Sequence, residues 1–212
     1  MKYYILIDKI NDGDIIRLDS GKYYKYVYGT KDSWIRTSIM IRYTWPEDEL
    51  YDLYKEINER EAAEQIEKQQ QMLDKLLILA GKVATEAHAG QVDKGGNPYI
   101  LHPKAVASGL SAIEYKVVAL LHDVLEDINI TAQDLQKMGF TNRIVNSVSI
   151  LTKKPNEAYT DYLRRIKSDS VAWHVKIADL QHNLDITRIP NPSPEDYERL
   201  NKYKDALFFL ES

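Results

Sequence analysis

Cysteine is absent from the 212 residues of this chain, which excludes both disulfides and a thiolate metal site. Long apolar runs are also missing, and no stretch approaches the roughly 20 residues that a membrane-spanning helix needs. The first residues, from Met1 to Ile5, lack the apolar region and cleavage site of a signal peptide. These absences predict a cytoplasmic protein with no membrane-bound part.

An excess of positive charge is missing as well. The chain has 28 Lys and Arg against 32 Asp and Glu, a formal net charge of −4. That balance argues against bulk nucleic-acid binding, but a metal ion and a few lysines can still set the field of a small site for an anionic nucleotide. With 44% hydrophobic and 28% charged residues, the composition is that of a soluble globular protein, long enough for one ordinary domain and an appendage.

Histidine is absent from the first part of the chain, where tyrosine is concentrated: nine of the 15 tyrosines lie within 3–54. Short β-type runs separated by turn signals predict a small antiparallel β-meander over 1–45. The expected strands are Tyr3–Ile7, Ile15–Leu18, Lys22–Tyr28 and Trp34–Tyr43. So few residues bury little surface, and we therefore expect the tyrosines to serve in packing, with a recognition surface as the alternative.

Glycine and proline are absent from 47–80. Pro46 and the acidic residues after it predict a helix start, and the charged, Gln-rich sequence that follows predicts a polar bridging helix over 46–72. From 73 to 212 the apolar spacing is helical. The expected helices include 114–125, 131–138, 142–152, 158–167, 170–184 and 194–211. The predicted fold class is thus mostly α, a helical bundle preceded by a small β unit and a bridging helix (α+β overall).

The stretch Leu120–Asp127 places polar residues inside an otherwise apolar helical run. On a helix, His122 and Glu126 are four residues apart and Asp123 and Glu126 three apart, so these side chains share one neighbourhood. Buried charged groups need a partner, and a divalent cation would satisfy such a cluster. The alternative is an ordinary amphipathic helix with a charge cluster.

Two further stretches favour the metal site. Downstream, Asp179 and Asn183 interrupt an apolar helical run one turn apart, and upstream lie the sequences AHAGQ and NPYILHP. The order H…HD…D resembles that of the HD-domain metal-dependent phosphohydrolases. The extended forms AHxGQ, KxGxPYIxHP, LLHDVxED and KIADxxHN are similar, more narrowly, to the (p)ppGpp hydrolase domain of the RelA/SpoT family. The resemblance covers roughly 73–212.

The resemblance implies that His102, His122, Asp123 and Asp179 hold one metal ion. Two imidazoles and two carboxylates form a mixed nitrogen and oxygen set, which leaves positions for water on a six-coordinate ion. Mn²⁺ is the cofactor that the resemblance implies; the residue types alone also admit iron, cobalt, nickel or magnesium. A bound ion lowers the pKa of its water and screens the charge of a phosphoryl oxygen.

The acidic pair Glu126 and Asp127 follows the HD residues by one helical turn and is placed to take a proton from that water. The resemblance assigns the pair this catalytic role. Asn183 lies four residues beyond the predicted ligand on its helix, and its amide suits a ribose or phosphate oxygen, with a surface asparagine as the alternative. By resemblance, Lys94, Thr152 and Lys153 face the phosphates of the substrate.

Other polar residues near the motifs receive supporting roles. Lys176 precedes the predicted ligand Asp179 by three residues and is expected to pair with a carboxylate. We expect His88 to be a core or supporting residue, His182 to pack or support a ligand, and His174 to lie at the surface.

Two departures from the family pattern concern the base of the nucleotide. Asp93 stands where the alarmone hydrolases have an arginine that stacks on guanine, and Leu184–Arg188 replaces a Met-Arg-Thr type sequence. A carboxylate cannot stack on a base as a guanidinium does, which predicts weaker guanine selectivity. It would also repel phosphates, so we expect Asp93 to turn outward or to pair with Lys94 or another cation.

The predicted function is metal-dependent hydrolysis of a nucleotide phosphoester, namely removal of the 3′-pyrophosphate of (p)ppGpp or a related alarmone of the stringent response by a stand-alone small hydrolase. Two alternatives remain: an HD phosphohydrolase acting on another nucleotide, and a non-catalytic nucleotide sensor that retains the metal. Residues 1–72 are the predicted surface for a homo-oligomer or a protein partner.

Overall fold

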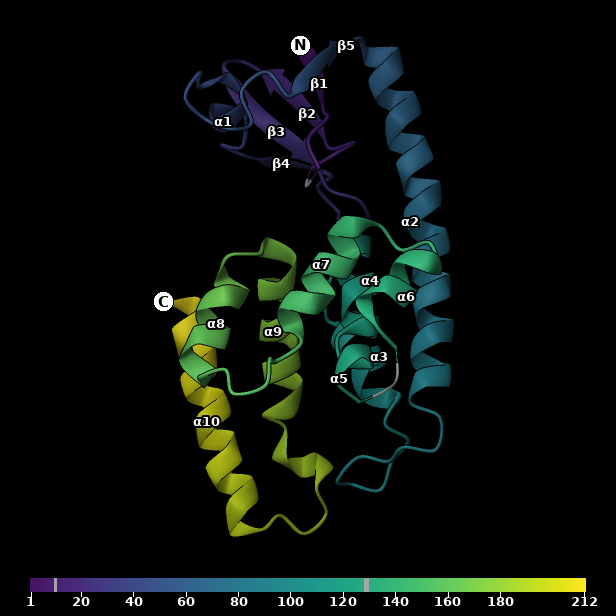
Figure 1. Cartoon of the computed structure of the whole chain (residues 1–212), viewed down its shortest axis with the longest axis vertical. Helices are drawn as coiled ribbons and strands as arrows, with labels where there is room; N and C mark the ends of the chain where they lie inside the picture. The colour runs from purple at the N-terminus through teal and green to yellow at the C-terminus, as the bar shows by residue number, and fades with distance from the viewer. Residues whose placement is uncertain (10, 128–129) are drawn as a thin grey trace. The chain divides into compact units, whose positions relative to one another are not determined.

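The computed structural model describes residues 1–9, 11–127 and 130–212, and of Asp127 it describes the backbone alone. The chain divides into two compact units, Met1–Lys75 and Leu76–Ser212. As Figure 1 shows, the first unit is built around a β-sheet and the second from helices. Each unit is described by itself below.

The first unit contains a five-stranded antiparallel sheet in the order β4-β3-β2-β1-β5. Its elements are β1 (Lys2–Leu6), β2 (Ile15–Asp19), β3 (Lys22–Tyr26), β4 (Trp34–Arg36), α1 (Met40–Thr44), β5 (Tyr54–Ile57) and the start of α2 (Glu59–Ala87). Ser20 and Gly21 have φ values of 50° and 74°, the backbone of a two-residue I′ turn, so the strands beside them pair without a gap.

Both faces of the sheet are covered within the first unit. Successive residues of a strand point to opposite faces. Tyr4 therefore packs with Tyr43 of α1 on one face, whereas Tyr3 packs with Ala62 of α2 on the other. All four side chains are buried, so these three tyrosines have the expected packing role, whereas Tyr51 is 48% exposed.

Two predictions for this unit are wrong. Trp34–Tyr43 is not one strand, because β4 ends after three residues and α1 follows. Pro46 does not begin a helix: it lies in a series of turns, and β5 then pairs with β1. Without β5, β1 would present an unpaired row of N–H and C=O groups, and this nonlocal pairing overrides the local helix signals.

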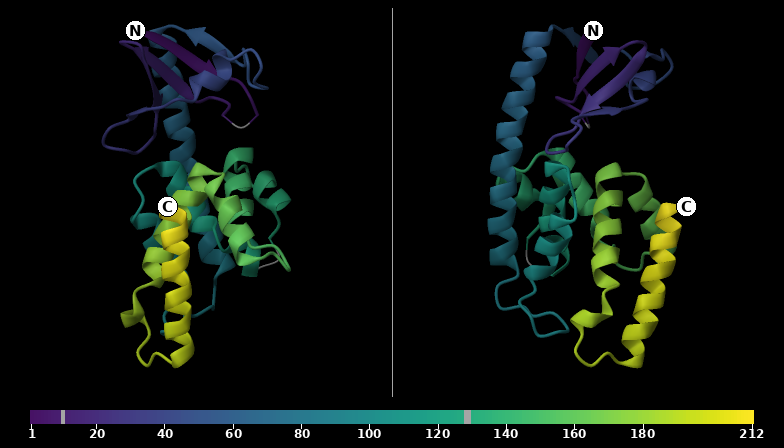
Figure 2. Two further views of the ribbon diagram at one scale, coloured as in Figure 1. Left: turned by 90° about the vertical axis from the view of Figure 1, so that its left-hand side faces the viewer. Right: turned by 180° about the vertical axis from the view of Figure 1, so that it is seen from behind.

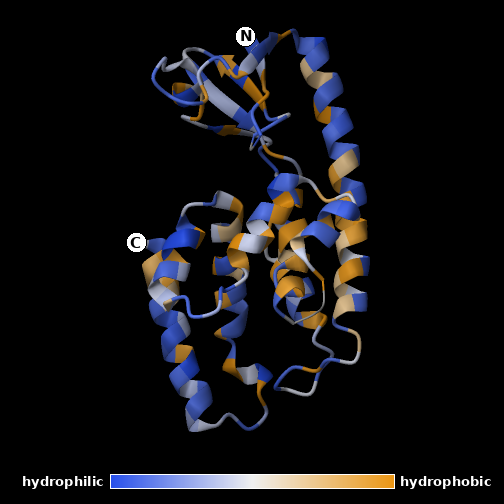
Figure 3. Cartoon of the chain, viewed as in Figure 1, coloured by the Kyte–Doolittle hydropathy of each residue, from blue (hydrophilic) through white to orange (hydrophobic). Residues whose placement is uncertain are grey.

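The polar helix begins later than predicted, at Glu59. Its first turn is held by a reciprocal cap: Asn58 Oδ1 accepts the backbone N–H of Glu61 at 2.9 Å, and the Glu61 carboxylate accepts that of Asn58 at 2.8 Å. Hydrophilic residues dominate the first turns of α2, and apolar residues become frequent in its last turns (Figure 3).

The second unit is a helical bundle, as predicted. After the last turns of α2 it contains α3 (Leu101–Ser108), α4 (Ile113–Leu121), α5 (Val124–Asp127), α6 (Ala132–Lys137), α7 (Asn142–Leu151), α8 (Tyr159–Lys167), α9 (Ser170–Asn183), the 3₁₀ turn η1 (Ile186–Arg188) and α10 (Pro194–Glu211). Helix α9 packs against α3, α4, α7, α8 and α10, and Figure 2 shows α10 running alongside it. Buried Val175 and Leu180 anchor it to the core.

The predicted helix 114–125 is interrupted where the HD residues lie. Helix α4 ends at Leu121, a turn holds His122 and Asp123, and α5 begins at Val124. In a continuous helix the carbonyl of Ala119 would accept the N–H of Asp123. The same carbonyl accepts a hydrogen bond from His122 Nδ1 at 2.7 Å, a side-chain bond that competes with the helix at its end.

Across the described residues, no helix combines the length and the apolar character that crossing a bilayer requires.

Candidate metal centre and substrate pocket

Four side chains from three places in the bundle converge on one point. His102 comes from the first turn of α3, His122 and Asp123 from the turn between α4 and α5, and Asp179 from α9. His102 Nε2 lies 3.2 Å from Asp179 Oδ1 and 3.7 Å from Asp123 Oδ2. His122 Nε2 lies 3.1 Å from Asp123 Oδ2 and 3.8 Å from Asp179 Oδ1.

The donor atoms of this group suit a metal ion. His102, His122 and Asp179 are buried and each offers one ligand atom, all within 4.8 Å of one another. His122 donates from Nδ1 to a backbone carbonyl, which leaves its buried Nε2 facing the acids without a hydrogen-bond partner. A buried nitrogen beside two carboxylates calls for a positive charge, either a proton or a cation, so this group can bind a metal ion.

The charges around the group favour a cation there. Burial lowers the pKa of His122, but Asp123 and Asp179 outweigh burial and raise it to about 9. Burial would raise the pKa of Asp179, yet Lys176 and the two imidazoles hold it well below its ordinary value. Asp179 therefore stays ionised, and beside Asp123 it attracts positive charge to the nitrogen between them.

Each carboxylate is oriented by a further polar side chain. Tyr99 donates its hydroxyl to Asp123 Oδ2 at 2.7 Å. Lys176 contacts Asp179 Oδ2 at 2.8 Å, which confirms the expected pairing, and Asn183 donates to Asp179 Oδ1 at 2.6 Å. Such contacts fix the direction of a carboxylate and the basicity of its oxygens.

Glu126 lies beside the group. Its Oε1 accepts the backbone N–H of Lys153 at 2.7 Å. The residue as a whole is exposed, but partial desolvation of its carboxyl raises the pKa of Glu126 above the ordinary value. The hydrogen bond from the Lys153 N–H lowers this pKa, and the charge of Asp123 raises it. The side chain of Asp127, the other predicted catalytic residue, lies outside the described part of the chain.

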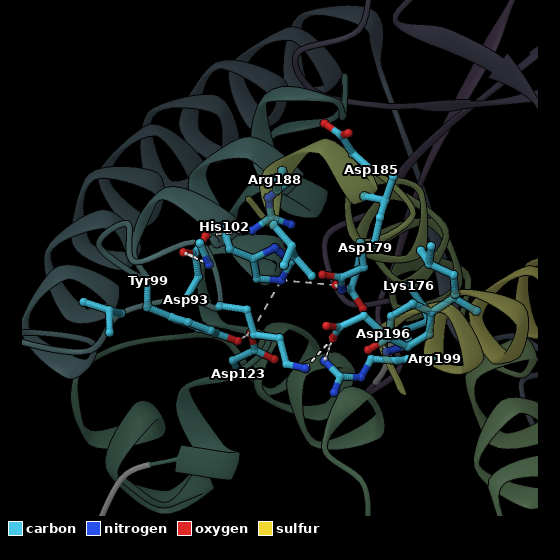
Figure 4. A pocket seen from close by; sticks show the side chains of 18 residues that line it. Asp93, Tyr99, His102, Asp123, Lys176, Asp179, Asp185, Arg188, Asp196 and Arg199 are labelled. Atoms are coloured by element: carbon cyan, nitrogen blue, oxygen red, sulfur yellow. Dashed lines mark hydrogen bonds and ion pairs between the residues drawn. The ribbon is translucent and has the colours of Figure 1, made fainter. Parts of the chain in front are cut away.

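A cavity of about 400 Å³ opens from the metal-binding group (Figure 4). Its wall is rich in charge of both signs. The acids are Asp93, Asp123, Asp179, Asp185 and Asp196, and the cations are Lys94, Lys176, Arg188 and Arg199. A pocket of this size and polarity fits a small, highly charged ligand.

The predicted phosphate-binding residues are distributed unevenly. Lys94 lines the pocket and forms an ion pair with Asp196, whose pKa this contact lowers to about 2. Asn183 also lines it. Thr152 and Lys153 are not among the described residues of its wall: Thr152 ends α7 and bonds the carbonyl of Val148, and the backbone of Lys153 contacts Glu126.

Several residues of the wall were not predicted from the sequence, among them Tyr99, Asp196, Arg199 and Tyr203. Tyr99 belongs to the PYIxHP motif, and its place three residues before His102 was a usable signal. Arg199 and Tyr203 lie one turn apart on α10 without any motif around them. No local pattern indicates that this helix borders the pocket.

The remaining histidines have distinct surroundings. His88 is buried and packs against Tyr99, with ring centroids 4.9 Å apart, as expected for a core residue. His182 contacts His102, Nδ1 to Nδ1, at 2.8 Å, which fits its expected supporting role. His174 is only partly exposed, because it stacks on Tyr115 at 4.7 Å, so the prediction of a surface residue is incomplete.

Comparison with solved structures first identifies a protein with the same fold. The chain shares its fold with a metazoan ortholog of SpoT whose structure has been solved and which hydrolyzes ppGpp: the TM-score is 0.54 at 20% identity, over 64% of this chain and 84% of that one. The predicted fold class, α+β with an HD-type helical bundle, is confirmed.

Sequence comparison then identifies relatives that match about half of this chain. The chain is 36% identical over 124 residues to the bifunctional (p)ppGpp synthase/hydrolase SpoT of Escherichia coli (strain K12), and 40% identical over 116 residues to the guanosine-3′,5′-bis(diphosphate) 3′-pyrophosphohydrolase of Vibrio cholerae. These matches cover 52% and 48% of this chain but 18% and 16% of the relatives. No family model matches. The resemblance to the (p)ppGpp hydrolases of the RelA/SpoT family is confirmed.

Proposed function

We propose that this chain is a metal-dependent hydrolase that removes the 3′-pyrophosphate of (p)ppGpp or a related alarmone. One observation carries the proposal: two imidazoles and two carboxylates meet at the wall of a charged pocket, in a chain whose relatives are named for this reaction. The pocket supplies a place for a polyphosphate beside the candidate metal centre.

The proposed metal ligands are His102, His122, Asp123 and Asp179, and the proposed ion is Mn²⁺. A bound divalent ion would supply a water of lowered pKa and would offset charge on the phosphoryl oxygen. The residues of the chain orient that chemistry. Tyr99 and the other donors to the carboxylates hold the ligand oxygens in place.

Glu126 is the proposed proton acceptor, together with Asp127. A raised pKa brings a carboxyl nearer to the operating pH, where proton transfer is more efficient. The bond from the Lys153 N–H keeps Glu126 in one orientation. After the phosphoester bond breaks, the same carboxyl can pass its proton to the leaving oxygen.

For the substrate, Lys94 and Asn183 are the proposed contacts within the pocket, and Thr152 and Lys153 approach the phosphates from the side of Glu126. Lys94 is held by Asp196, so a phosphate would have to share or replace this partner. The ion pair keeps the lysine ordered before substrate binds.

We assign the chemistry to 73–212, the bridging role to the helical part of 46–72, which begins at Glu59, and a docking role to 1–45, with residues 1–72 as the surface for a second copy or a partner protein. The proposed location is the cytoplasm. None of the proposed ligands or catalytic residues lies in the first unit, which supports this division.

The test is incubation of the purified chain and Mn²⁺ with ppGpp, ppApp, NADPH and dNTPs, followed by identification of the products. Release of pyrophosphate with formation of a nucleoside 5′-diphosphate from ppGpp is the expected result. If only another nucleotide is hydrolysed, the proposed substrate is wrong and the chain is a phosphohydrolase for that nucleotide. If a nucleotide binds tightly and none is hydrolysed, the chain is a nucleotide sensor and not an enzyme.

A further inference from the structure

Asp93 and Arg188 form an ion pair across one wall of the pocket, although 95 residues separate them in the sequence. Arg188 Nη2 lies 3.2 Å from Asp93 Oδ2, and the two side chains are 24% and 13% exposed. Both point into the region beside His102 (Figure 4). This pair is the cation contact expected for Asp93, with Arg188 in place of Lys94.

The loop around Asp93 is built for this contact. Asp93 Oδ1 accepts the backbone N–H groups of Gly95 and Asn97, both at 2.9 Å, so the carboxylate is fixed before it meets the arginine. A Cβ atom at Gly95 would lie 2.3 Å from the carbonyl oxygen of Arg188. The two segments can approach this closely because position 95 has no side chain.

The edge of the guanidinium is further occupied by His182. Arg188 Nη1 lies 2.9 Å from His182 Nδ1 and 3.3 Å from its carbonyl oxygen. Asp93 and His182 thus engage both terminal nitrogens. These three contacts fix the orientation of the guanidinium, and apolar Val92, Ile186 and Ile189 line the same cavity.

This arrangement selects against a phosphate and for a flat, uncharged ring. A phosphate seeks the N–H groups of an arginine, several of which already contact Asp93 and His182, and the carboxylate at 3.2 Å would repel it. An aromatic ring instead stacks on the guanidinium face, and a carboxylate on the edge does not oppose this contact.

We infer that Arg188 is the residue that stacks on the purine base of the nucleotide, and that Asp93 is a positioning residue that holds the guanidinium edge-on. The inference rests on the proposed function for the presence of a nucleotide. It assigns the base to the wall formed by 92–95 and 186–189, and leaves the phosphates to the metal centre and Lys94.

The experiment compares binding of ppGpp and of inorganic pyrophosphate by calorimetry in the Glu126→Gln background, with Mn²⁺ present. Arg188→Lys keeps the charge but loses the planar face. It should weaken ppGpp binding roughly 3- to 30-fold, the range of one cation–π contact, and leave pyrophosphate binding unchanged. Arg164→Lys is the matched control, because Arg164 is exposed and pairs with Asp161, which is exposed as well; it should change neither affinity.

Asp93→Asn supplies a change in the opposite direction. It removes the negative charge but keeps an oxygen for the loop, so the freed guanidinium should bind pyrophosphate more tightly while ppGpp binding weakens. Equal losses for both ligands in Arg188→Lys, or no loss for ppGpp, would overturn the inference.

Failure of the inference is distinguishable from failure of the proposed function. If the unsubstituted protein binds ppGpp but does not hydrolyse it, the proposed hydrolase function is contradicted. The measured affinities for ppGpp and pyrophosphate still test the role of Arg188 in that case. If ppGpp does not bind at all, both are overturned.

Discussion

The imidazoles of His102 and His182 meet through their Nδ1 atoms at 2.8 Å. Burial and the charge of Arg188 lower the pKa of His182 to about 4, so this ring is neutral at ordinary pH and its Nδ1 accepts a hydrogen bond. Arg188 Nη1 lies 2.9 Å from the same Nδ1, so two donors share this acceptor. When His102 donates from its Nδ1, the lone pair of its Nε2 faces Asp179, and His182 thereby supports this tautomer of a candidate metal ligand.

Removing this acceptor should weaken metal binding. We expect His182→Leu to lower the affinity for Mn²⁺ by about 10- to 100-fold, the usual effect of losing a residue that supports a ligand. His182→Asn places an amide oxygen near the position of Nδ1 and should restore part of the loss. Competition with a chelator measures the affinity, and His174→Leu serves as the control. An unchanged affinity in His182→Leu would show that His102 needs no such support.

Asp123 should be required for the metal and not only for the fold. Asp123→Ala should abolish retention of the ion on elemental analysis. Excess Mn²⁺ stabilises a protein that binds it by about 4 kcal/mol at 1,000 times Kd, and the variant should lack this rise in melting temperature. Tyr99→Phe removes the hydroxyl bound to Asp123 but keeps the carboxylate, so it should retain the ion. Full metal content in Asp123→Ala contradicts the assignment.

Glu126 should serve proton transfer and not ligation. Glu126→Gln keeps an oxygen for the Lys153 N–H, so the variant should fold and retain its metal but lose about 10²-fold or more in kcat. Because the pKa of Glu126 is raised, the acid limb of the rate profile should lie at a higher pH than an ordinary carboxyl gives. Glu86→Gln, at an exposed position, is the control. Near-normal turnover in Glu126→Gln would remove this residue from the mechanism.

The metal-free protein should lose stability as the pH rises. Although burial lowers the pKa of His122, the neighbouring acids raise it to about 9. The protonated ring therefore stabilises the fold fully below about pH 6.5 and progressively less as the pH rises through 9. Urea unfolding of the metal-free chain at pH 6, 7.5 and 9 measures this, and Mn²⁺ should reduce the dependence by taking the place of the proton. A midpoint that rises over this range would contradict the charge balance described for the site.

The first unit should be dispensable for the chemistry. Leu6 is fully buried in its core, and Leu6→Ala should cost about 2–5 kcal/mol, enough to unfold so small a unit. Turnover per molecule should persist, because the candidate site lies in the second unit. Limited proteolysis reports on the first unit, and Leu53→Ala at a more exposed position is the control. Loss of turnover while the helical unit stays folded would place part of the chemistry in 1–75.

The sequence predicted contacts that follow helical spacing and missed those that cross the chain. Lys176 lies three residues from Asp179 on one helix, and its contact with a carboxylate was predicted. Asn183 lies four residues away, and its contact with Asp179 follows the same spacing, although only a substrate contact was predicted for it. The pair of Asp93 and Arg188 joins distant segments, and no local pattern carries such a contact. The helices from 142 to 211 were predicted closely because their apolar periodicity and caps are local.

The missed strand has the same physical origin. Tyr54–Ile57 becomes a strand because β1 needs a partner, which the residues of 54–57 do not disclose by themselves. The break in the HD helix is different, since a histidine side chain can compete with a backbone N–H only where the turn brings it near the carbonyl. The motifs thus identified the candidate site residues, whereas the path of the backbone between them became known only from the structure.

His122 is a candidate metal ligand, and its side chain also bonds the carbonyl of Ala119 where helix α4 ends. If this imidazole is deleted, the carbonyl is released to the N–H of Asp123, and the helix is free to continue through the turn. Asp123 would then rotate with the helix and leave its place beside His102. A substitution at position 122 is therefore expected to disturb two candidate ligands at once, because it changes the end of the helix as well as removing the imidazole nitrogen.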